Sequence, residues 1–432
     1  MPKLYSQHLE ILATRYRKVM QTFDLDSIII SSGHKTYYFQ DDYTHTFHAF
    51  SGAQQWLPFS LCSDVYILLN KEDKPLLFWP KRDDFWHSDN CLPEGDWSDL
   101  WQTIEARKDY DILSHLGKKH AWIGPKPDHI QANFNRQSEL EAAINYHKAY
   151  KTEYEIEAVY QANLEAVAGH KAAEKAFIEG KSELTIYHDY LNASHQGAVN
   201  EPYPGIMALN QNAAILHYDV KSHQPQSQSH TLLIDAGANH KGYASDITRT
   251  FSQDTGLFKA MLDSMEELQL SLCEHAVAGI DFNDLHNECV TGVAKILAKH
   301  KICNLSVEEQ LEKRIPQVFF PHGLGHLLGL QVHDLGGHQI DEAGTIQSPS
   351  DNAPFLRLTR RLEENMVITI EPGLYFIPML LEKMQAEIKD HGCDLELIES
   401  LKHFGGIRIE DNLVIGKESP RNLTREAFAT LA

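Results

Sequence analysis

Four segments of the sequence that resemble strands each carry a carboxylate within or beside an apolar run. The four side chains are Asp235 in LLIDAG, Asp246 in SDITRT, Glu371 in MVITIE and Glu410 in GIRIED. Taken singly, such a residue is more often a strand-end cap or a surface charge. If the four strands share a sheet, however, the carboxylates crowd together, and desolvation and mutual repulsion oppose their ionisation. Bound cations are the usual remedy, so the pattern indicates a metal site.

A glycine-rich stretch offers nitrogen ligands for such a site. Residues 320–338 read FPHGLGHLLGLQVHDLGGH and hold four histidines among five glycines. Histidine in apolar surroundings is a satisfied core group, a metal ligand or a proton carrier, and glycine lets a backbone come close to a neighbour. One imidazole added to the four carboxylates gives an oxygen-rich shell. That shell suits Mn²⁺, Co²⁺ or Zn²⁺, and two ions rather than one.

The segments that carry these residues alternate with predicted helices. Strand-like runs lie at 231–237, 242–251, 366–376 and 406–415, and helices are predicted at 183–193, 257–277 and 284–299. Strands interrupted by helices predict an α+β domain with a mostly antiparallel sheet. Asp235 and Asp246 lie eleven residues apart around Gly237 and Gly242, so we expect a hairpin whose two arms share a metal pair. Residues 221–230 look like an exposed loop, and residues 340–358 and 377–405 look like insertions.

A chain of 432 residues is too long for one simple core, so we expect two domains. Short apolar runs at 27–30, 65–69 and 75–80 predict strands of a smaller α/β domain that opens with a helix. Ser138 with Glu141, and Thr152 with Glu155, each fit a capping box, and Gly180 is a plausible stop for the second helix. We therefore predict an N-terminal domain at 1–151 and a second domain at 152–432.

Composition narrows the classes of function. The formal net charge of −21 argues against nucleic acid as a partner, because phosphate binding needs a basic face. No segment approaches the roughly 20 uninterrupted apolar residues of a membrane helix, and a cytoplasmic protein without a membrane span is expected. The six cysteines show no CxxC pair, which favours reduced thiols over a disulfide framework or a zinc knuckle.

Four blocks of the sequence together resemble a known family. IDAGANHKGYASDITRTF, PHGLGHLLGLQVHD, IEPGLY and GIRIEDN occur in the order and character of the pita-bread metallopeptidases. Among these, the chain is most similar to bacterial Xaa-Pro dipeptidases (prolidases), including the relatives known as organophosphorus acid anhydrolases. FQDD at 39–42 and WLPF at 56–59 extend the resemblance more weakly to the N-terminal half. The resemblance implies a pita-bread catalytic domain, with a curved antiparallel sheet and covering helices, behind the smaller α/β domain.

The resemblance also implies a ligand set for two metal ions, with Mn²⁺ expected and Co²⁺ or Zn²⁺ as alternatives. The implied ligands are Asp235, Asp246, His326, Glu371 and Glu410. Asp246 and Glu410 would bridge the two ions. The segment HGLGH looks like a helical zinc pair, but Gly323 and Gly325 argue against a helix there, so only His326 is taken as a ligand. All five ligand types are present, which disfavours a metal-free relative.

Further residues are assigned to the substrate by the same resemblance. His217 and His333 would hydrogen-bond the substrate carbonyl or carboxylate and the tetrahedral intermediate, although alone each is more often a core or surface histidine. Arg408 would hold the C-terminal carboxylate of a dipeptide, pair with a metal-bound carboxylate, or do both. The remaining pocket residues would be Tyr203, His322 and Val332, with structural packing an open alternative for Val332.

The implied reaction is metal-assisted hydrolysis of an Xaa-Pro dipeptide. Glu371 would take a proton from the attacking water and pass it to the proline nitrogen, which carries no hydrogen in a tertiary amide. The nearest alternative is an aminopeptidase P, which accepts longer Xaa-Pro chains. A non-catalytic interaction protein on the same fold is the alternative from another class, and hydrolysis of organophosphorus esters is an expected side activity at most.

A homodimer is the last implication of the resemblance. Residues from the N-terminal domain of one subunit would close the active site of the other. Asp42 and Trp56 are the candidates, because they lie in the N-terminal segments that match. Asp42 would bind the substrate α-amino group, with Asp41 an equal contender.

Overall fold

The computed structural model describes residues 2–71, 74–81, 85–86, 91–106, 109–128, 134–197 and 199–431. The chain forms two compact units. The smaller unit comprises Met1–Glu157, Lys241–Tyr243 and Asp341–Thr345, and the larger comprises Ala158–His240, Ala244–Ile340 and Ile346–Ala432. Within the described ranges, no helix combines the length and the apolar character needed to cross a membrane.

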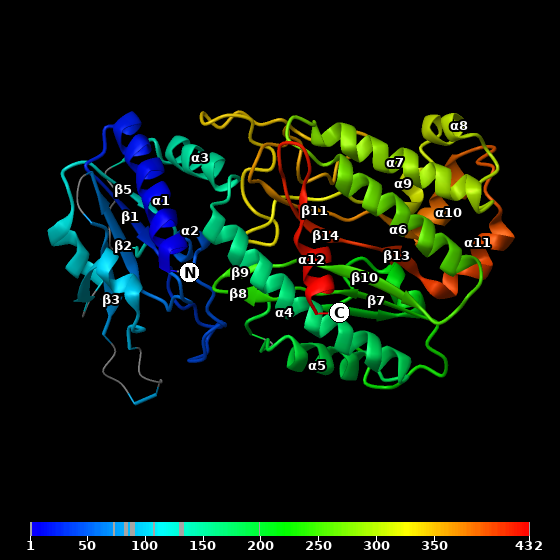
Figure 1. The fold of residues 1–432 in the computed structure, drawn as a ribbon, viewed down its shortest axis with the longest axis horizontal. Coiled ribbons are helices and arrows are strands. Elements are labelled where there is room, and N and C mark those ends of the chain that lie inside the picture. Colours follow the sequence, from blue (N-terminus) through cyan, green and yellow to red (C-terminus); the bar gives the residue numbers. More distant parts are fainter. Residues whose placement is uncertain are drawn as a thin grey trace. The chain divides into compact units, whose positions relative to one another are not determined.

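A mixed five-stranded sheet lies at the centre of the smaller unit, in the order β4-β3-β2-β1-β5 (Figure 1). Its strands are β1 (Ser27–Ser31), β2 (Tyr66–Asn70), β3 (Leu76–Pro80), β4 (Gln102–Ala106) and β5 (His120–Ile123). Strand β1 pairs antiparallel with β2 and parallel with β5, and its three isoleucines are completely buried. The other elements are α1 (Pro2–Phe23), α2 (Ser51–Gln54), α3 (Gln137–Lys148) and the 3₁₀ helices η1 (Asp96–Leu100) and η2 (Asp109–His115). The predicted α/β character of this half is confirmed.

One of the two predicted capping boxes is wrong. Helix α3 begins at Gln137, so Ser138 lies inside its first turn and caps nothing. The reason is a competing interaction: the Gln137 amide donates both to the Trp122 carbonyl, at 2.6 Å, and to the Glu141 carboxylate, at 2.7 Å. Glu141 is therefore engaged by Gln137 and not by a backbone N–H at the helix start.

The second capping box is confirmed. The Glu155 carboxylate accepts from the Thr152 backbone N–H at 2.8 Å, and the Thr152 hydroxyl accepts from the Glu155 backbone N–H at 3.4 Å. These bonds start α4 (Glu153–Ile178), which ends just before Gly180. Gly180 has a φ of +73°, the left-handed conformation that commonly follows a helix and that glycine adopts without strain.

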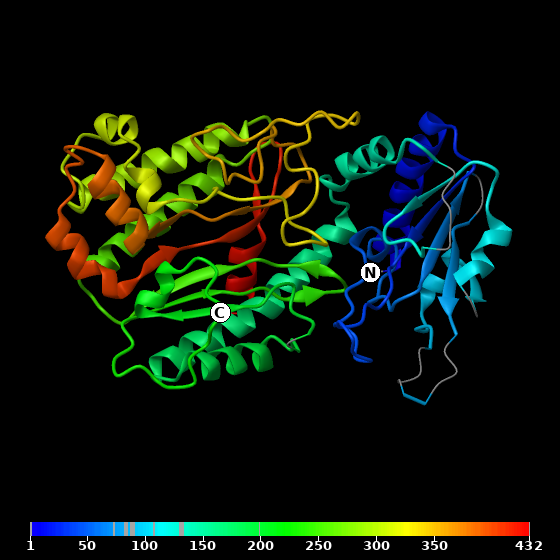
Figure 2. The same cartoon turned by 180° about the vertical axis from the view of Figure 1, so that it is seen from behind.

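The strands of the larger unit pair only in antiparallel fashion over the part of the chain that the structure describes. One sheet has the order β10-β7-β6, a second has the order β11-β14-β15, β12 pairs with β13, and β8 pairs with β9. Figure 1 labels most of these strands, and Figure 2 shows them from behind in green to red. The bounds are β6 (Ile206–Leu209), β7 (Thr231–Asp235), β8 (Asn239–His240), β9 (Tyr243–Ala244), β10 (Thr248–Ser252), β11 (Val367–Ile370), β12 (Gly373–Tyr375), β13 (Gly406–Arg408), β14 (Asp411–Val414) and β15 (Arg421–Asn422). The predicted antiparallel α+β architecture is confirmed.

Helices cover these sheets and bury their apolar faces. Phe177 of α4 and Tyr190 of α5 pack with Met207 and Ile234 of the first sheet in one buried cluster. The remaining elements are α5 (Glu183–Ala193), α6 (Leu257–His275), α7 (Phe282–Lys299), α8 (Val307–Glu312), α9 (Pro316–Phe319), α10 (Pro378–Glu387), α11 (Leu395–Leu401), α12 (Leu423–Thr430), η3 (Asn210–Ala214) and η4 (Lys402–Phe404). The predicted loop at 221–230 contains no helix or strand, whereas the segment 377–405 contains α10, α11 and η4.

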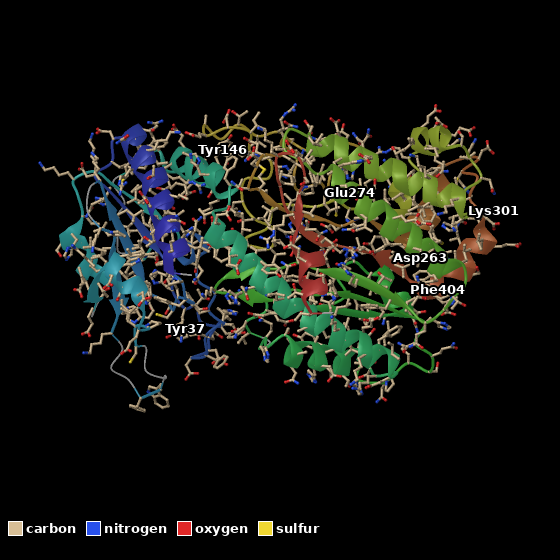
Figure 3. The ribbon with its side chains drawn as sticks, viewed as in Figure 1. Tyr37, Tyr146, Asp263, Glu274, Lys301 and Phe404 are labelled. Atoms are coloured by element: carbon tan, nitrogen blue, oxygen red, sulfur yellow. The ribbon has the colours of Figure 1, made fainter. Side chains whose placement is uncertain are left out.

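A hairpin of exposed aromatic side chains stands out in the smaller unit. An isolated bridge joins Tyr37 to Thr44, and the rings of Tyr38 and Tyr43 stack with their centroids 6.2 Å apart. Tyr37 (labelled in Figure 3) is 65% exposed, and Phe39 at the tip is 91% exposed. These rings form an exposed aromatic group in the described part of the smaller unit.

The buried His286 on α7 leads to a prediction about acid stability. Desolvation by burial lowers the pKa of His286 to about 4, below its ordinary value of about 6.5. The unfolded chain binds this proton first, so the stabilisation is complete above pH 6.5 and is lost as the pH falls, at about 1.4 kcal/mol per pH unit. Relative to the wild type, His286→Leu should therefore gain about 2 kcal/mol in unfolding free energy between pH 7 and pH 5. Urea unfolding of both proteins at the two pH values measures this shift.

His188 provides the control for this measurement because it is exposed on α5. The effect of burial is taken as the change for His286→Leu between the two pH values beyond the change for His188→Leu. A pH-independent difference for His286→Leu would contradict the assignment.

Candidate metal centre

Three of the predicted metal ligands converge in the larger unit. Asp246, His326 and Glu410 each offer one ligand atom, and these atoms lie within 4.8 Å of one another. All three side chains are buried, with exposures of 6%, 3% and 2%. Buried donors that converge in this way are what a divalent cation requires.

Strand register brings the carboxylates together. Asp235 ends β7 and lies opposite Thr248, the first residue of β10. Thr248 forms a second bridge, to Glu410, and its hydroxyl donates to the Glu410 carboxylate at 2.7 Å. Asp246 lies two residues before Thr248, in the link between β9 and β10. The pairing of Thr248 with Asp235 and Glu410, together with this short link, places the three carboxylates near one threonine.

His326 reaches this cluster because its backbone runs very close to β11. A Cβ atom on Gly325 would lie 2.0 Å from the carbonyl oxygen of Thr369, so only glycine fits there. The carbonyl of Leu327 accepts from Nδ1 of His326 at 3.0 Å, which fixes the proton on Nδ1. Nε2 is therefore free to act as a ligand, and it lies 3.4 Å from Asp246 and 3.6 Å from Glu371. The expectation that glycines here permit a close backbone approach is confirmed at Gly325.

Glu371 lies between two histidines just after β11. One carboxylate oxygen faces His326, and the other lies 3.7 Å from Nδ1 of His322. Burial, reinforced by the charges of Asp246 and Asp235, raises the pKa of Glu371 to about 7. The side chain retains 17% exposure, more than His326 at 4%.

The donor set fits divalent cations. Burial raises the pKa of Asp235 and raises that of Glu410 well above its usual range, with the charge of Asp246 adding to both shifts. For Asp246 itself, burial acts in the same direction, but the hydrogen bond and charge of His326 outweigh it and leave its pKa lowered. Carboxylates packed so closely repel one another, and cations remove that repulsion. Oxygen donors with one imidazole nitrogen suit Mn²⁺, Co²⁺ or Zn²⁺.

Arg408 holds the cluster from the side of β13. Its Nη2 pairs with the Asp235 carboxylate, Nη1 donates to the Tyr375 hydroxyl at 2.9 Å, and Nε donates to the Thr248 hydroxyl at 3.2 Å. The Tyr203 hydroxyl donates to Asp235 at 2.9 Å and to Asp246 at 2.5 Å. Arg408 therefore pairs with the Asp235 carboxylate, and Tyr203 contacts both Asp235 and Asp246.

His322 belongs to a chain of hydrogen bonds that starts at Arg408. The Gly323 carbonyl accepts from its Nδ1 at 2.8 Å, so Nε2 accepts from the Tyr375 hydroxyl, also at 2.8 Å. Burial, followed by the positive charge of Arg408, lowers the pKa of His322 to about 3. His322 is thus a neutral imidazole beside Glu371.

Three further predicted substrate residues of the larger unit are less buried than the carboxylates. His333 is exposed, and its ring stands perpendicular to that of His326 with centroids 4.5 Å apart. His217 is exposed in the segment after η3, and Val332 is half-buried. The structure therefore brings His333 against His326 and leaves both His333 and His217 open to solvent.

Sequence reasoning missed the residue that holds the segment carrying His217. Glu183, fully buried at the start of α5, accepts four hydrogen bonds of 2.8–2.9 Å. The donors are the backbone N–H groups of Leu209 and Ser222 and the side chains of Asn212 and Tyr218. The only signal in the sequence is an acidic residue after Ser182, which also fits an ordinary helix start.

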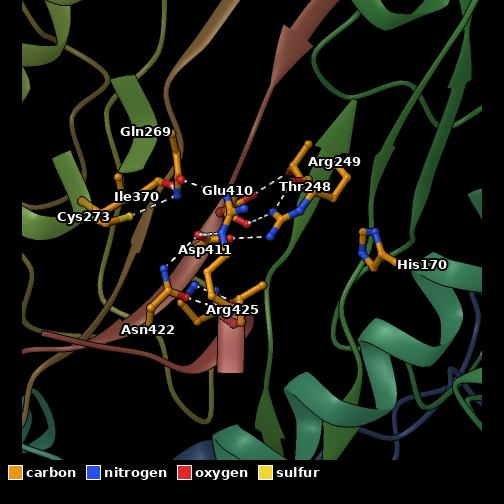
Figure 4. Close-up of polar contacts among 12 residues, drawn as sticks. His170, Thr248, Arg249, Gln269, Cys273, Ile370, Glu410, Asp411, Asn422 and Arg425 are labelled. Atoms are coloured by element: carbon orange, nitrogen blue, oxygen red, sulfur yellow. Dashed lines mark hydrogen bonds and ion pairs between the residues drawn. The ribbon is translucent and has the colours of Figure 1, made fainter. Parts of the chain in front are cut away.

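A network of charges behind Glu410 was also missed (Figure 4). Asp411 is completely buried and accepts from Arg249 and Arg425, each at 2.6 Å. Burial opposes its ionisation, but the charges of the two arginines outweigh it and hold the pKa of Asp411 below its usual range. Arg249 also donates to the backbone carbonyls of Thr248 and Glu410, each at 2.8 Å. The network therefore fixes the backbone from which the Glu410 carboxylate projects.

Comparison with known proteins identifies relatives of both units. Residues 157–417 match metallopeptidase family M24, and residues 3–148 match the Xaa-Pro dipeptidase N-terminal domain. The Xaa-Pro dipeptidases of Shewanella amazonensis and Pseudoalteromonas translucida are 38% and 39% identical to this chain over 429 residues, with 98% of each chain covered. Among solved structures, zinc-substituted E. coli aminopeptidase P in complex with product superposes with a TM-score of 0.72 and 21% identity, covering 99% of this chain and 98% of that one.

Proposed function

The chain belongs to metallopeptidase family M24 and is an Xaa-Pro dipeptidase, and we propose which of its residues take part in hydrolysing the dipeptide. The proposed metal ligands are Asp235, Asp246, His326, Glu371 and Glu410. The observation that carries the proposal is the convergence of ligand atoms from Asp246, His326 and Glu410 within 4.8 Å. Aminopeptidase P shares the fold at 21% identity, well below the 38% shared with the dipeptidases.

We propose that the site holds two divalent cations, with Mn²⁺ the expected metal and Co²⁺ or Zn²⁺ the alternatives. When bound, such a pair lowers the pKa of a coordinated water and polarises the scissile carbonyl. Four carboxylates balance the charge of two divalent ions, which supports a pair over a single ion. Elemental analysis of the purified enzyme would identify the metal and give the number per subunit.

Glu371 is proposed to move the proton. Its carboxylate retains some exposure next to the His326 ring, so water and substrate have access to it. An Xaa-Pro bond has a tertiary amide nitrogen with no hydrogen, and this nitrogen must gain a proton to leave as the amine of proline. Glu371 would accept a proton from the attacking water and deliver it to that nitrogen.

The residues around Glu371 are proposed to position the substrate. His217 and His333 lie on the solvent side and would hydrogen-bond the substrate carbonyl or carboxylate. Arg408 uses three of its nitrogens within the protein, and its remaining N–H groups would pair with the C-terminal carboxylate of the dipeptide. His322 would keep its neutral imidazole beside the reacting bond, with Val332 at the pocket wall.

We further propose a homodimer in which the aromatic hairpin contacts the second subunit. The side chains of Tyr37 and Phe39 are exposed in a single protomer, and contact with a second subunit would bury them. Asp41 and Asp42 lie in the same hairpin. Asp41 accepts from the Tyr43 backbone N–H at 3.1 Å and so shapes the turn, which makes Asp42 the better candidate for binding an α-amino group.

The burial of Trp56 contradicts its prediction as a substrate residue. Its side chain is completely buried in the smaller unit, with the rings of Tyr16 and Trp101 against it at 5.1 and 6.3 Å. A side chain without exposed surface cannot touch a substrate bound by another subunit.

Comparing dipeptide and tripeptide hydrolysis tests the proposed function. With metal-reconstituted enzyme, kcat/KM for an Xaa-Pro dipeptide should exceed that for the matching Xaa-Pro-Yaa tripeptide by about 100-fold. In the tripeptide, a neutral peptide group takes the place of the carboxylate that would pair with Arg408. The buried guanidinium then lacks its partner, which raises the activation free energy by about 3 kcal/mol. Equal or faster tripeptide hydrolysis would instead indicate aminopeptidase P specificity.

A further inference from the structure

Two cysteines that are ninety positions apart face each other in the larger unit. Cys303 follows α7, and Cys393 precedes α11 in the segment that connects β12 with β13. An isolated antiparallel bridge pairs the two residues. The Asn304 N–H donates to the Gly392 carbonyl at 2.8 Å, and the Asp394 N–H donates to the Ile302 carbonyl at 2.9 Å.

These flanking hydrogen bonds define the geometry of the pair. Because they run between the neighbours and not between the cysteines, Cys303 and Cys393 occupy a non-hydrogen-bonded position of an antiparallel pair. At such positions the Cα atoms are typically about 4.5 Å apart, and the side chains are at their closest. A disulfide needs Cα atoms about 4.4–6.8 Å apart. The backbone therefore already has the spacing that a cross-strand disulfide requires.

The two thiol groups meet at one place. The Cys303 and Cys393 sulfur atoms lie 3.4 and 3.5 Å from the same carbonyl oxygen, that of His391. A hydrogen bond between the two thiols lowers the pKa of Cys303 to about 7 and raises that of Cys393. One proton is thus lost readily from the pair near neutral pH, and the thiolate is the form that reacts with disulfides.

We propose that Cys303 and Cys393 form a reversible disulfide on reaction with a small-molecule disulfide. Cys393, at 9% exposure the more accessible of the two against 1% for Cys303, passes its proton to the Cys303 thiolate across their hydrogen bond. Cys393 then attacks one sulfur of the reagent and releases one equivalent of reduced thiol, leaving a mixed disulfide. The second cysteine then attacks the protein sulfur of that mixed disulfide and releases the second equivalent. The pair is oxidised by two electrons, the reagent is reduced by two, and the two cysteine protons end on the released thiols.

The disulfide would anchor the segment between β12 and β13, the two strands that carry residues of the candidate metal centre. β12 bears Tyr375 and β13 bears Arg408, and the residues between these strands contain α10, α11 and Cys393. Tying Cys393 to the end of α7 closes a long loop, which is the kind of loop that gains most from a disulfide in the chain-entropy account. The oxidised protein should therefore be the more heat-stable form. This inference concerns a modification site and does not depend on the peptidase activity.

The test uses the full-length, metal-loaded enzyme equilibrated with mixtures of oxidised and reduced glutathione. Free thiols are alkylated, and the digest is mapped by mass spectrometry. Oxidising mixtures should yield one peptide crosslinked between Cys303 and Cys393, and dithiothreitol should convert it to two alkylated peptides. The midpoint of thermal unfolding should rise by at least about 3 °C on oxidation and fall again on reduction.

Three variants separate this pair from the other thiols. Cys303→Ala and Cys393→Ala should each abolish the thermal shift, whereas Cys91→Ala, which removes an exposed cysteine, should retain it. The proposal is overturned if Cys303 and Cys393 remain alkylatable in the oxidising mixtures, or if crosslinks form only through Cys91. Mapping of the unsubstituted enzyme decides the matter even if a variant fails to fold.

Discussion

Replacing Glu371 by glutamine is expected to lower kcat for Xaa-Pro dipeptides by at least about 10³-fold. Glutamine keeps the size of the side chain but cannot accept a proton and return it, and general acid–base catalysis contributes about 10²–10⁴-fold in rate. The substitution also removes one of the negative charges that attract the cations. Measuring kcat together with the metal content of the same preparation separates the two effects.

Glu364→Gln is the matched control, because Glu364 is exposed a few residues before the same strand. It should leave kcat within about twofold of the wild-type value. A Glu371→Gln enzyme that binds its full complement of metal and turns over at a near-wild-type rate would rule out the proposed proton transfer.

Asp411→Asn is expected to lower the unfolding free energy by about 3 kcal/mol at pH 7. Removing one partner of a buried ion pair leaves the other charge uncompensated, which typically costs about 3–5 kcal/mol. The lower end applies here because Arg425 is 30% exposed, although Arg249 is only 10% exposed. Since Arg249 also binds the Glu410 and Thr248 carbonyls, metal affinity should fall as well. Urea unfolding of the metal-free proteins and a metal titration measure the two effects.

The stabilisation that the Asp411 carboxylate provides should decrease at low pH. The pKa of Asp411 lies below its usual range because the charges of Arg249 and Arg425 outweigh the effect of burial. The stabilisation is therefore present above the ordinary pKa of aspartate, about 3.9, and is lost as the pH falls below it. Glu266→Gln, which removes the partly exposed partner of Arg425, should cost less than about 1 kcal/mol. An equal loss of unfolding free energy in both variants would contradict the claim that Asp411 stabilises the protein as a buried ion-pair partner.

Local patterns in the sequence predict the strands that carry or flank the carboxylates. The apolar runs in LLIDAG, SDITRT and GIRIED predict such strands, and the bridges from Thr248 to Asp235 and Glu410 show them pairing. Glycine content predicts a close backbone approach, and Gly325 makes one. These features depend on a few neighbouring residues or on the period of a strand, which a sequence displays directly.

Features that depend on distant partners could not be predicted. Tyr375 becomes a link between Arg408 and His322 only through the pairing of β12 with β13. Trp56 is a candidate only because its segment resembles the family, whereas its complete burial is a property of the folded unit. Ser138 fitted a capping motif that Gln137 displaced through a bond to a strand carbonyl. In each case the deciding contact lies outside the local window.

The placement of the metal ligands has a consequence for how the protein matures. The proposed ligands run from Asp235 to Glu410, and the bridge between Thr248 and Glu410 closes only after almost the whole chain is available. Pairings of such long sequence separation form slowly, because loop-closure entropy opposes them. A nascent chain that ends before Glu410 lacks one of the proposed donors. We therefore expect cations to bind only after the larger unit has been synthesised and has folded. Bound cations then stabilise the folded unit by mass action.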